Sequence, residues 1–238
     1  MSYHKLKLIN VMLGVHLGDA LGVPFEAMTR HEILDATEGK GVDRPRFDLK
    51  IERKVADTRG LAPGSTSDDS QLANAVADAL ILGDGYDHEW QVLLHLMSLW
   101  NDVAGWGGTT KRSLYEIDKW YRAQPKARIK VPQFKNERDR KMWDEAKPRN
   151  PREPARWHAQ SRGNGVAMKI APFAAFLAVR GGDDIFDSGE ALAQFLEFGR
   201  ITHADPICTL AAYAVGSVIY DRVRGLDAQH AFLKLQSR

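Results

Sequence analysis

The stretch Gly64-Ser65-Thr66-Ser67-Asp68-Asp69-Ser70-Gln71 leads directly into the apolar run Leu72 to Leu82. Apolar side chains recur through this run at approximately helical spacing, which predicts a helix from about Asp68 to Leu82. The loop before it, Arg59 to Gly64, contains glycine and proline. The sequence therefore places two adjacent acids, Asp68 and Asp69, at the start of a helix.

The acidic pair has two interpretations. A hydroxyl and two successive carboxylates at one helix start offer clustered oxygen ligands, which a hard cation such as Mg2+ prefers, usually together with several waters. Asp, Ser and Thr also favour N-caps, and Asp68 with Gln71 fits the pattern of a capping box. Caps are far commoner than metal sites, so the local pattern alone favours capping, and the metal site stays open.

Composition limits the function classes. The 238 residues carry a formal net charge of only +2, which gives no argument for a nucleic-acid partner. The single cysteine, Cys208, cannot form an internal disulfide and suits a reducing compartment. His16 and Asp19 interrupt the apolar run Leu8 to Phe25, so we expect neither a signal peptide nor a membrane-spanning segment. These features predict a cytoplasmic protein.

Helical periodicity continues along the chain, without a convincing strand, repeat or interior domain boundary. The fold class is therefore expected to be all-α, a single compact multi-helix bundle. Residues 122–162 are rich in proline, lysine and arginine, and predict a long basic connection with at most a short helix near residues 139–146. Its charge could attract a phosphate-bearing ligand, although a solvated loop is the simpler interpretation. The other expected helices are 6–21, 30–37, 87–100, 113–121, 166–177 with a kink at Pro172, 188–201, a helix opened by Asp205 and Pro206, and 227–235.

The first expected helix has an unusual glycine pattern. Gly14, Gly18 and Gly22 repeat every four residues, and each costs about 1 kcal/mol relative to alanine inside a helix. A close-packed neighbouring helix or a ligand approaching the backbone would offset that cost. Asp19 and Glu26 lie in the same apolar region, where an acid is usually a hydrogen-bonded structural group and less often a catalyst.

Two later turns have features of ligand-binding loops. Gly163-Asn164-Gly165 opens a helix, and its backbone N–H groups could face an anion such as a diphosphate, although Gly and Asn also form ordinary turns. His203 precedes the helix that Asp205 caps and Pro206 begins. The histidine could contact a substrate or act only in capping.

Taken together, five segments resemble the ADP-ribosylglycohydrolase family, in the family's order, from about Leu8 to Arg224. Any one of them would be a weak signal, whereas five in order are specific and favour the metal site over capping. The segments are Gly18-Asp19-Ala20-Leu21-Gly22 with Pro24-Phe25-Glu26, the acidic stretch Gly64 to Gln71, the glycine-threonine loop Gly105 to Thr110, Gly163 to Pro172, and Thr202-His203-Ala204-Asp205-Pro206.

The resemblance implies an all-helical enzyme that holds two Mg2+ ions in a cleft. Such enzymes hydrolyse the N- or O-glycosidic bond between ADP-ribose and a protein side chain, or a related ADP-ribosyl bond. By resemblance, Ser67, Asp68 and Asp69 are metal ligands, and Glu26 with Asp68 or Asp69 shares the acid and base roles. The residues implied in binding ADP-ribose are Gly108, Thr109, Gly163, Asn164, Gly165, Met168 and His203.

The sequence also departs from the family pattern. The family's second acidic cluster, D-x-D-T, is absent, since Asp183-Asp184 and Asp227 lie in other contexts, so we expect the domain of residues 1–238 to be incomplete at its C-terminal end. Serines at 67 and 70 and a lysine at 169 replace the family's threonines and arginine. Three hypotheses follow: a Mg-dependent hydrolase acting on ADP-ribosylated protein, a truncated and catalytically weak module that binds ADP-ribose or a nucleotide, and a structural all-α protein.

Overall fold

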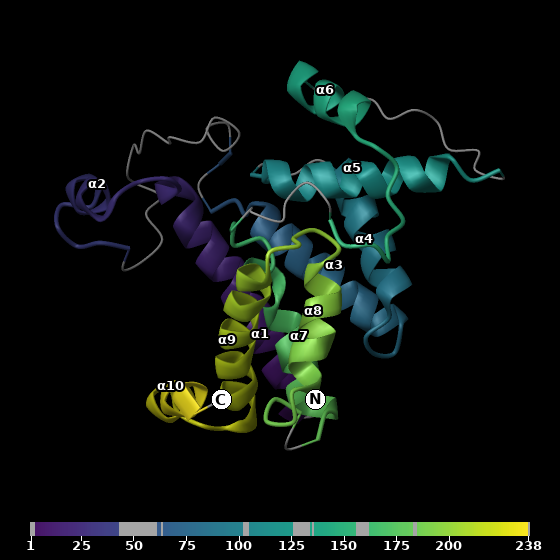
Figure 1. Ribbon diagram of the computed structural model, residues 1–238. Helices are drawn as coiled ribbons and strands as arrows, with labels where there is room; N and C mark the ends of the chain where they lie inside the picture. Colours follow the sequence, from purple (N-terminus) through teal and green to yellow (C-terminus); the bar gives the residue numbers. More distant parts are fainter. Residues whose placement is uncertain are drawn as a thin grey trace.

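The computed structural model describes residues 3–42, 61–62, 64–101, 105–125, 134, 136–155, 162–182 and 185–237. Within these ranges all of the regular structure is helical, which confirms the predicted all-α class (Figure 1). The α-helices are α1 (Tyr3–Gly22), α2 (Arg30–Ala36), α3 (Asp68–Leu82), α4 (His88–Trp100), α5 (Gly108–Arg122), α6 (Glu137–Glu145), α7 (Ala171–Arg180), α8 (Glu190–Gly199), α9 (Pro206–Arg224) and α10 (Ala228–Ser237), with short 3-10 helices η1 (Val23–Phe25) and η3 (Ala167–Lys169).

Helix α7 lies at the centre of the packing, against α1, α3 and α9. Its residues are almost all apolar, so it can be buried on most sides, and Phe173 at its first turn is fully buried. Aromatic rings from α8 pack on Phe173, with centroids 5.1 Å away for Phe195 and 5.8 Å for Phe198. Helix α5 lies across one end of this group and α6 packs on α5 (Figure 1).

Helix α1 is fixed to the start of α3 by one buried carboxylate. Asp19 accepts hydrogen bonds from Ser67 N (2.8 Å), Ser67 Oγ (2.7 Å) and Ser70 N (3.0 Å). The Ser67 Oγ in turn accepts from Asp69 N, so Ser67 is the N-cap of α3. The interpretation of Asp68 as the cap, one of the two that the local sequence pattern left open, is therefore wrong, because Asp68 is the first residue inside the helix. The Asp68 carboxylate is therefore not the capping group of α3.

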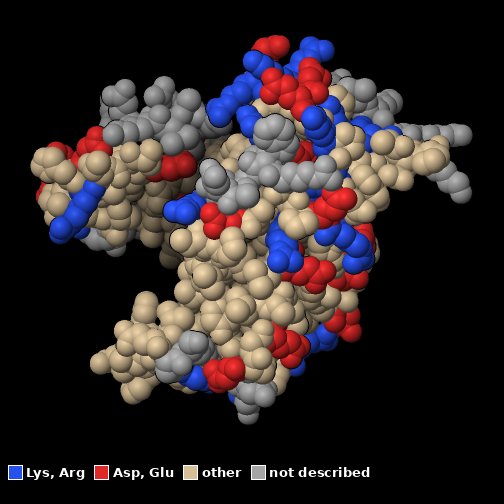
Figure 2. All heavy atoms as spheres, in the orientation of Figure 1, with Lys and Arg blue, Asp and Glu red and all other residues tan. Residues whose placement is uncertain are grey.

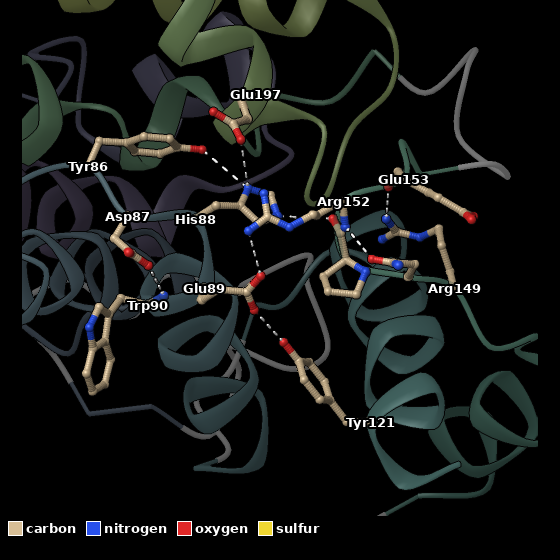
Figure 3. A network of polar contacts seen from close by, with 12 residues as sticks. Tyr86, Asp87, His88, Glu89, Trp90, Tyr121, Arg149, Arg152, Glu153 and Glu197 are labelled. Carbon is tan, nitrogen blue, oxygen red and sulfur yellow. Dashed lines mark hydrogen bonds and ion pairs between the residues drawn. The ribbon is translucent and has the colours of Figure 1, made fainter. Parts of the chain in front are cut away.

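A second polar network fixes part of the 122–162 segment (Figure 3). His88 at the start of α4 lies 3.2 Å from the carbonyl oxygen of Pro151, and Glu89 pairs with Arg152 at 3.1 Å. Deeper in the protein, buried Arg149 pairs with Glu116 of α5 at 3.0 Å. The predicted short helix is present as α6, and the described part of the connection after it is held by polar contacts, of which that of Arg149 is buried and that of Arg152 is exposed. Residues 126–133, 135 and 156–161 lie outside the described ranges, as do 43–60 and 183–184.

Two helix starts differ from the predictions. Pro172 stands at the beginning of α7 and does not kink a longer helix, because the preceding residues form the separate turn η3. This is the position where a missing N–H costs nothing. Helix α5 begins at Gly108, five residues earlier than expected, so the glycine-threonine loop supplies its first turn.

The apolar stripe of α1 forms the predicted helix but does not face the core. Its large side chains are 38–61% exposed, while Leu8, Met12 and Val15 on a neighbouring face are partly buried and Asp19 is buried. The exposed stripe consists of Leu6, Ile9, Leu13 and Leu17. Figure 2 shows a similar lack of charge over α9, whereas acidic and basic side chains gather over α6.

Contrary to the sequence-based expectation, one described helix is long and apolar enough to cross a membrane. By length and composition alone, Lys5–Phe25 meets that criterion. Signal sequences and core helices of soluble proteins meet the same criterion, and this segment lies near the N-terminus. It also carries Asp19, whose three hydrogen bonds join it to α3.

The Asp19 contacts predict a large and local stability effect. Asp19→Ala removes an acceptor from two buried backbone N–H groups and one hydroxyl, so the free energy of unfolding should fall by about 2–4 kcal/mol. The matched control is Asp78→Ala, an exposed acid on α3, which should change it by less than about 0.5 kcal/mol. Urea unfolding followed by circular dichroism measures both. Equal midpoints for the two variants would contradict the role given to Asp19.

Candidate active site

A cleft of about 360 Å³ opens where α1, α3 and α5 meet the loops before η3 and α9. The structure brings to it every residue that the sequence analysis assigned to the site, from five separate segments. Sequence reasoning did not assign several others that line it, including Gly22, Val23, Gly107 and Thr110. The assigned residues lining the cleft are Glu26, Ser67, Asp68, Asp69, Gly108, Thr109, Gly163, Asn164, Gly165, Met168 and His203.

The glycines of α1 explain how this helix can border a cleft. A Cβ added at Gly14, Gly18 or Gly22 would meet no atom within 4 Å, so no neighbouring helix packs tightly against them among the described residues. Gly18 and Gly22 line the cleft instead. Of the two explanations open at the level of sequence, space for an approaching ligand is the one that agrees with the structure.

One wall of the cleft is strongly acidic. Asp19, Glu26, Asp68 and Asp69 line it, and none of the described lining residues is a lysine or arginine. Burial raises the pKa of Asp68 to about 7, and the nearby Asp69, Glu26 and Asp19 charges add to the effect. Burial, then Asp19 and Glu26, raises the pKa of Asp69 to about 6. The carboxylates therefore repel one another, which favours a bound cation or a retained proton.

Gly105 shapes the same wall. A Cβ at this residue would lie 2.6 Å from Asp68 Oδ1 and 3.2 Å from Ser67 Cβ, and its φ of +98° is one that side chains rarely adopt. A glycine is therefore required here for the loop to pass directly over the acidic pair. The loop limits the freedom of the Asp68 carboxylate on one side.

The donor set suits Mg2+ in its chemistry but is incomplete. Carboxylate oxygens are the ligands that this ion prefers, and two acids with raised pKa values are a suitable start. Among the described residues, however, no group of three or more His, Cys, Asp or Glu side chains is placed to hold a metal ion. The hydroxyl of Ser67 already donates to Asp19 and caps the helix. The described residues therefore offer carboxylate oxygens of the right chemistry but no complete set of metal ligands.

Another part of the cleft lining is the N-terminal end of α5. Helix α5 starts from Gly107 without a side-chain cap and has no acid in its first turn. Gly108, Thr109 and Thr110 of that turn line the cleft. The N-terminal end of a helix carries a partial positive charge and N–H groups without intrahelical partners, which makes it suitable for an anion.

His203 and the Gly163–Gly165 loop complete the lining. A Cβ at Gly165 would lie 2.5 Å from His203 Cε1, so the imidazole packs directly on the backbone of this glycine. At Gly163 the corresponding distance, to His203 Nε2, is an ordinary 3.7 Å. Asn164 contributes its carbonyl, which accepts from Met168 N at 3.0 Å and closes the turn into η3.

A buried lysine stands behind the lining, and the sequence analysis did not give it a role. Lys169 is fully buried, and its Nζ lies 3.0 Å from His95 Nε2 and 3.3 Å from Thr202 Oγ1. Burial lowers its pKa to about 7, and Asp68 acts in the opposite direction. The only signal in the sequence was the lysine at a position where the resemblance favours arginine. His95 lies inside α4 and gave no signal at all.

Comparison with known sequences agrees with the geometry of the cleft. No curated protein matched the chain in a direct search. The ADP-ribosylglycohydrolase family, by contrast, matches residues 3–238, which is nearly the whole chain and includes every segment that lines the cleft. The chain therefore belongs to the ADP-ribosylglycohydrolase family.

Proposed function

We propose that this chain binds ADP-ribose in the cleft and, with Mg2+, hydrolyses the glycosidic bond that joins ADP-ribose to a protein side chain or a related group. One observation carries the proposal beyond family membership. Two helix N-termini border the same cleft, and that of α3 presents Asp68 and Asp69 while that of α5 is uncapped and without acids. The cleft thus has a cation-binding end and an anion-binding end.

This polarity matches the chemistry of ADP-ribose. The diphosphate is the ligand's charged group and would lie against the first turn of α5 and the Gly163–Gly165 loop, where backbone N–H groups can donate to it. The terminal ribose is uncharged and rich in hydroxyls, so its place is beside the carboxylates. A cavity of about 360 Å³ falls in the range typical of small-molecule sites.

The acids can supply the proton transfers that hydrolysis needs. Water adds at the anomeric carbon and loses a proton, while the departing side-chain atom gains one. One carboxyl of the Asp68 and Asp69 pair, whose pKa values are raised to about 7 and about 6, can hold a proton near neutral pH and give it to the leaving group. Glu26, which lines the cleft and is exposed, can accept the proton of the water. Mg2+, when held by Ser67 and the other carboxylate of the pair, would orient ribose hydroxyls and offset the charge that develops, because a carboxylate bound to the metal is ionised and cannot be the acid.

One observation favours a second candidate, a module that binds ADP-ribose or a nucleotide without hydrolysing the bond. No group of three or more His, Cys, Asp or Glu side chains among the described residues is placed to hold a metal ion, and a few oxygen ligands would leave Mg2+ mostly hydrated. Binding through the α5 end and the glycine loop does not need the metal. The two candidates therefore differ in whether Mg2+ affects affinity.

The first prediction separates them by isothermal titration of ADP-ribose, with Mg2+ and with EDTA. For the wild type, Mg2+ should tighten binding at least about tenfold, equivalent to about 1.4 kcal/mol. The double variant Asp68→Asn, Asp69→Asn should lose that gain, while Asp78→Asn on the exposed side of α3 should keep it. Release of ADP-ribose from arginine- and serine-linked peptides then tests hydrolysis.

The outcomes have distinct meanings. Binding that is the same with EDTA and survives the double variant would favour the non-catalytic module. Absence of ADP-ribose binding in every condition would contradict both candidates.

The second prediction concerns pH. The pKa of Asp68 is about 7 in the folded protein, against an ordinary value of 3.8 for an aspartate, so the folded state binds more protons between about pH 4 and pH 7. The free energy of unfolding must then fall as the pH rises through that window. Asp68→Asn removes the buried charge and should stabilise the protein at pH 8, by at most about 4 kcal/mol, but much less at pH 5.

Thermal melting at the two pH values, in EDTA, measures this effect, with Asp78→Asn as the control. Added Mg2+ at pH 8 should raise the melting temperature of the wild type and leave that of Asp68→Asn nearly unchanged. A gain for Asp68→Asn that is equal at pH 5 and pH 8 would show that Asp68 is not the titrating group.

A further inference from the structure

Four buried polar side chains form a continuous path from the interior to the cleft. His95, Lys169 and Thr202 have no exposed surface, and His203 is 3% exposed. They come from α4, η3 and the turn between α8 and α9, so three distant segments converge on one path. Buried polar groups are costly unless they are hydrogen-bonded, and here each has a partner within the path.

His95, at the buried end of the path, determines which atoms donate and which accept in the first hydrogen bond of the path. His95 Nδ1 lies 2.6 Å from the carbonyl oxygen of Gln91, which can only accept, so the proton of this imidazole is on Nδ1. Burial keeps the pKa of His95 well below its usual value, so the ring is neutral. His95 Nε2 is consequently an acceptor, and Lys169 Nζ, 3.0 Å away, donates to it.

Lys169 also forms a hydrogen bond with Thr202, the next residue along the path. Its Nζ also donates to Thr202 Oγ1 at 3.3 Å, and a hydroxyl that accepts still has one hydrogen to give. His203 Nδ1 lies 3.0 Å from the same oxygen. The Thr202 oxygen could also accept from His203, but its buried hydrogen would then have no acceptor among the described contacts, since protonated Lys169 only donates. Donation of this hydrogen to Nδ1 leaves the imidazole proton of His203 on Nε2.

The Nε2 edge of His203 faces the glycine loop of the cleft. A Cβ at Gly163 would lie 3.7 Å from Nε2, and one at Gly165 would lie 3.0 Å from it. Turning the ring over would exchange Nδ1 for Cδ2 and lose the contact with Thr202 Oγ1. The turn itself is fixed as well, because His203 N donates to Gly199 O at 2.8 Å.

We propose that Lys169 is a positioning residue, which through Thr202 holds His203 in the tautomer that presents Nε2–H to the cleft, where it donates to an oxygen of the bound ligand. The identity of that ligand, ADP-ribose, rests on the proposed function. The tautomer does not, because the hydrogen bonds that set it lie within the protein.

The test measures the tautomer directly, by NMR of the full chain labelled with 15N-histidine, without any ligand. The signals of His203 are assigned by their loss in His203→Gln. In the wild type, Nδ1 should show the shift of an unprotonated nitrogen and Nε2 that of a protonated one. Thr202→Val and Lys169→Met should each return His203 to a mixture of both tautomers.

Thr209→Val is the matched control, since it also removes a buried hydroxyl next to Gly199 but lies off the path. It should leave the His203 signals unchanged. ADP-ribose titration of the same variants should show affinity lowered roughly threefold to tenfold by Thr202→Val, the effect of about one hydrogen bond, and unchanged by Thr209→Val. If the Lys169→Met variant does not fold, the tautomer of His203 in Thr202→Val alone tests the inference.

A wild-type His203 that carries its proton on Nδ1, or a tautomer that neither Thr202→Val nor Lys169→Met alters, would overturn the inference. A tautomer that behaves as expected in a chain that does not bind ADP-ribose would support the inference and contradict the proposed function instead.

Discussion

The carboxylate of Asp19 is the contact on which the rest of the site depends. The first N–H groups of a helix need acceptors, and the acids at the start of α3 would ordinarily supply them. Here Asp19 accepts from the backbone of Ser67 and Ser70, and the Ser67 hydroxyl caps Asp69 N. With the helix end satisfied from α1, the carboxylates of Asp68 and Asp69 are not consumed by capping and can line the cleft. Capping and a ligand site were alternatives in the sequence; in the structure a third acid, 48 residues away, allows both.

The acids at the start of α3 and the partial positive charge at the start of α5 border one cleft, and glycines allow two backbone segments to pack closely against side chains that line it. Gly105 lets one loop pass over Asp68, and Gly165 lets another pack against His203. The start of α5, which has no side-chain cap and no acid in its first turn, lies in the same cleft as the acid-bearing start of α3. A ligand with an anionic middle and a neutral, hydroxyl-rich end fits this arrangement better than a wholly anionic one, which the carboxylates would repel.

Helix bounds that depend on interactions between neighbouring residues were predicted correctly from the sequence. The bounds of α3 and the Asp205-Pro206 start of α9 follow from caps and spacing within a few residues, and both are confirmed. The true cap of α3 was missed because its reason, Asp19, is distant in sequence. The exposed stripe of α1, the anchoring of Arg149 and the meeting of Lys169 with His95 likewise depend on which helices pack together. The family resemblance supplied the cleft residues, since no spacing rule would have joined five segments.

The buried carboxylates that line the cleft lower the free energy of unfolding at neutral pH. Lys169 interacts electrostatically with one of them, Asp68, and is also hydrogen-bonded in the path to His203. Burial and mutual repulsion raise the pKa values of Asp68 and Asp69, so the folded chain is less stable at neutral pH than it would be with amides there. Evolution commonly tolerates such a cost where the charges act on a ligand. The Lys169 charge favours ionised Asp68 electrostatically while its N–H groups hold the path to His203. A change in the proton or cation content of the acidic wall therefore alters the field at Lys169, and Lys169 is two hydrogen bonds from His203, which lines the same cleft.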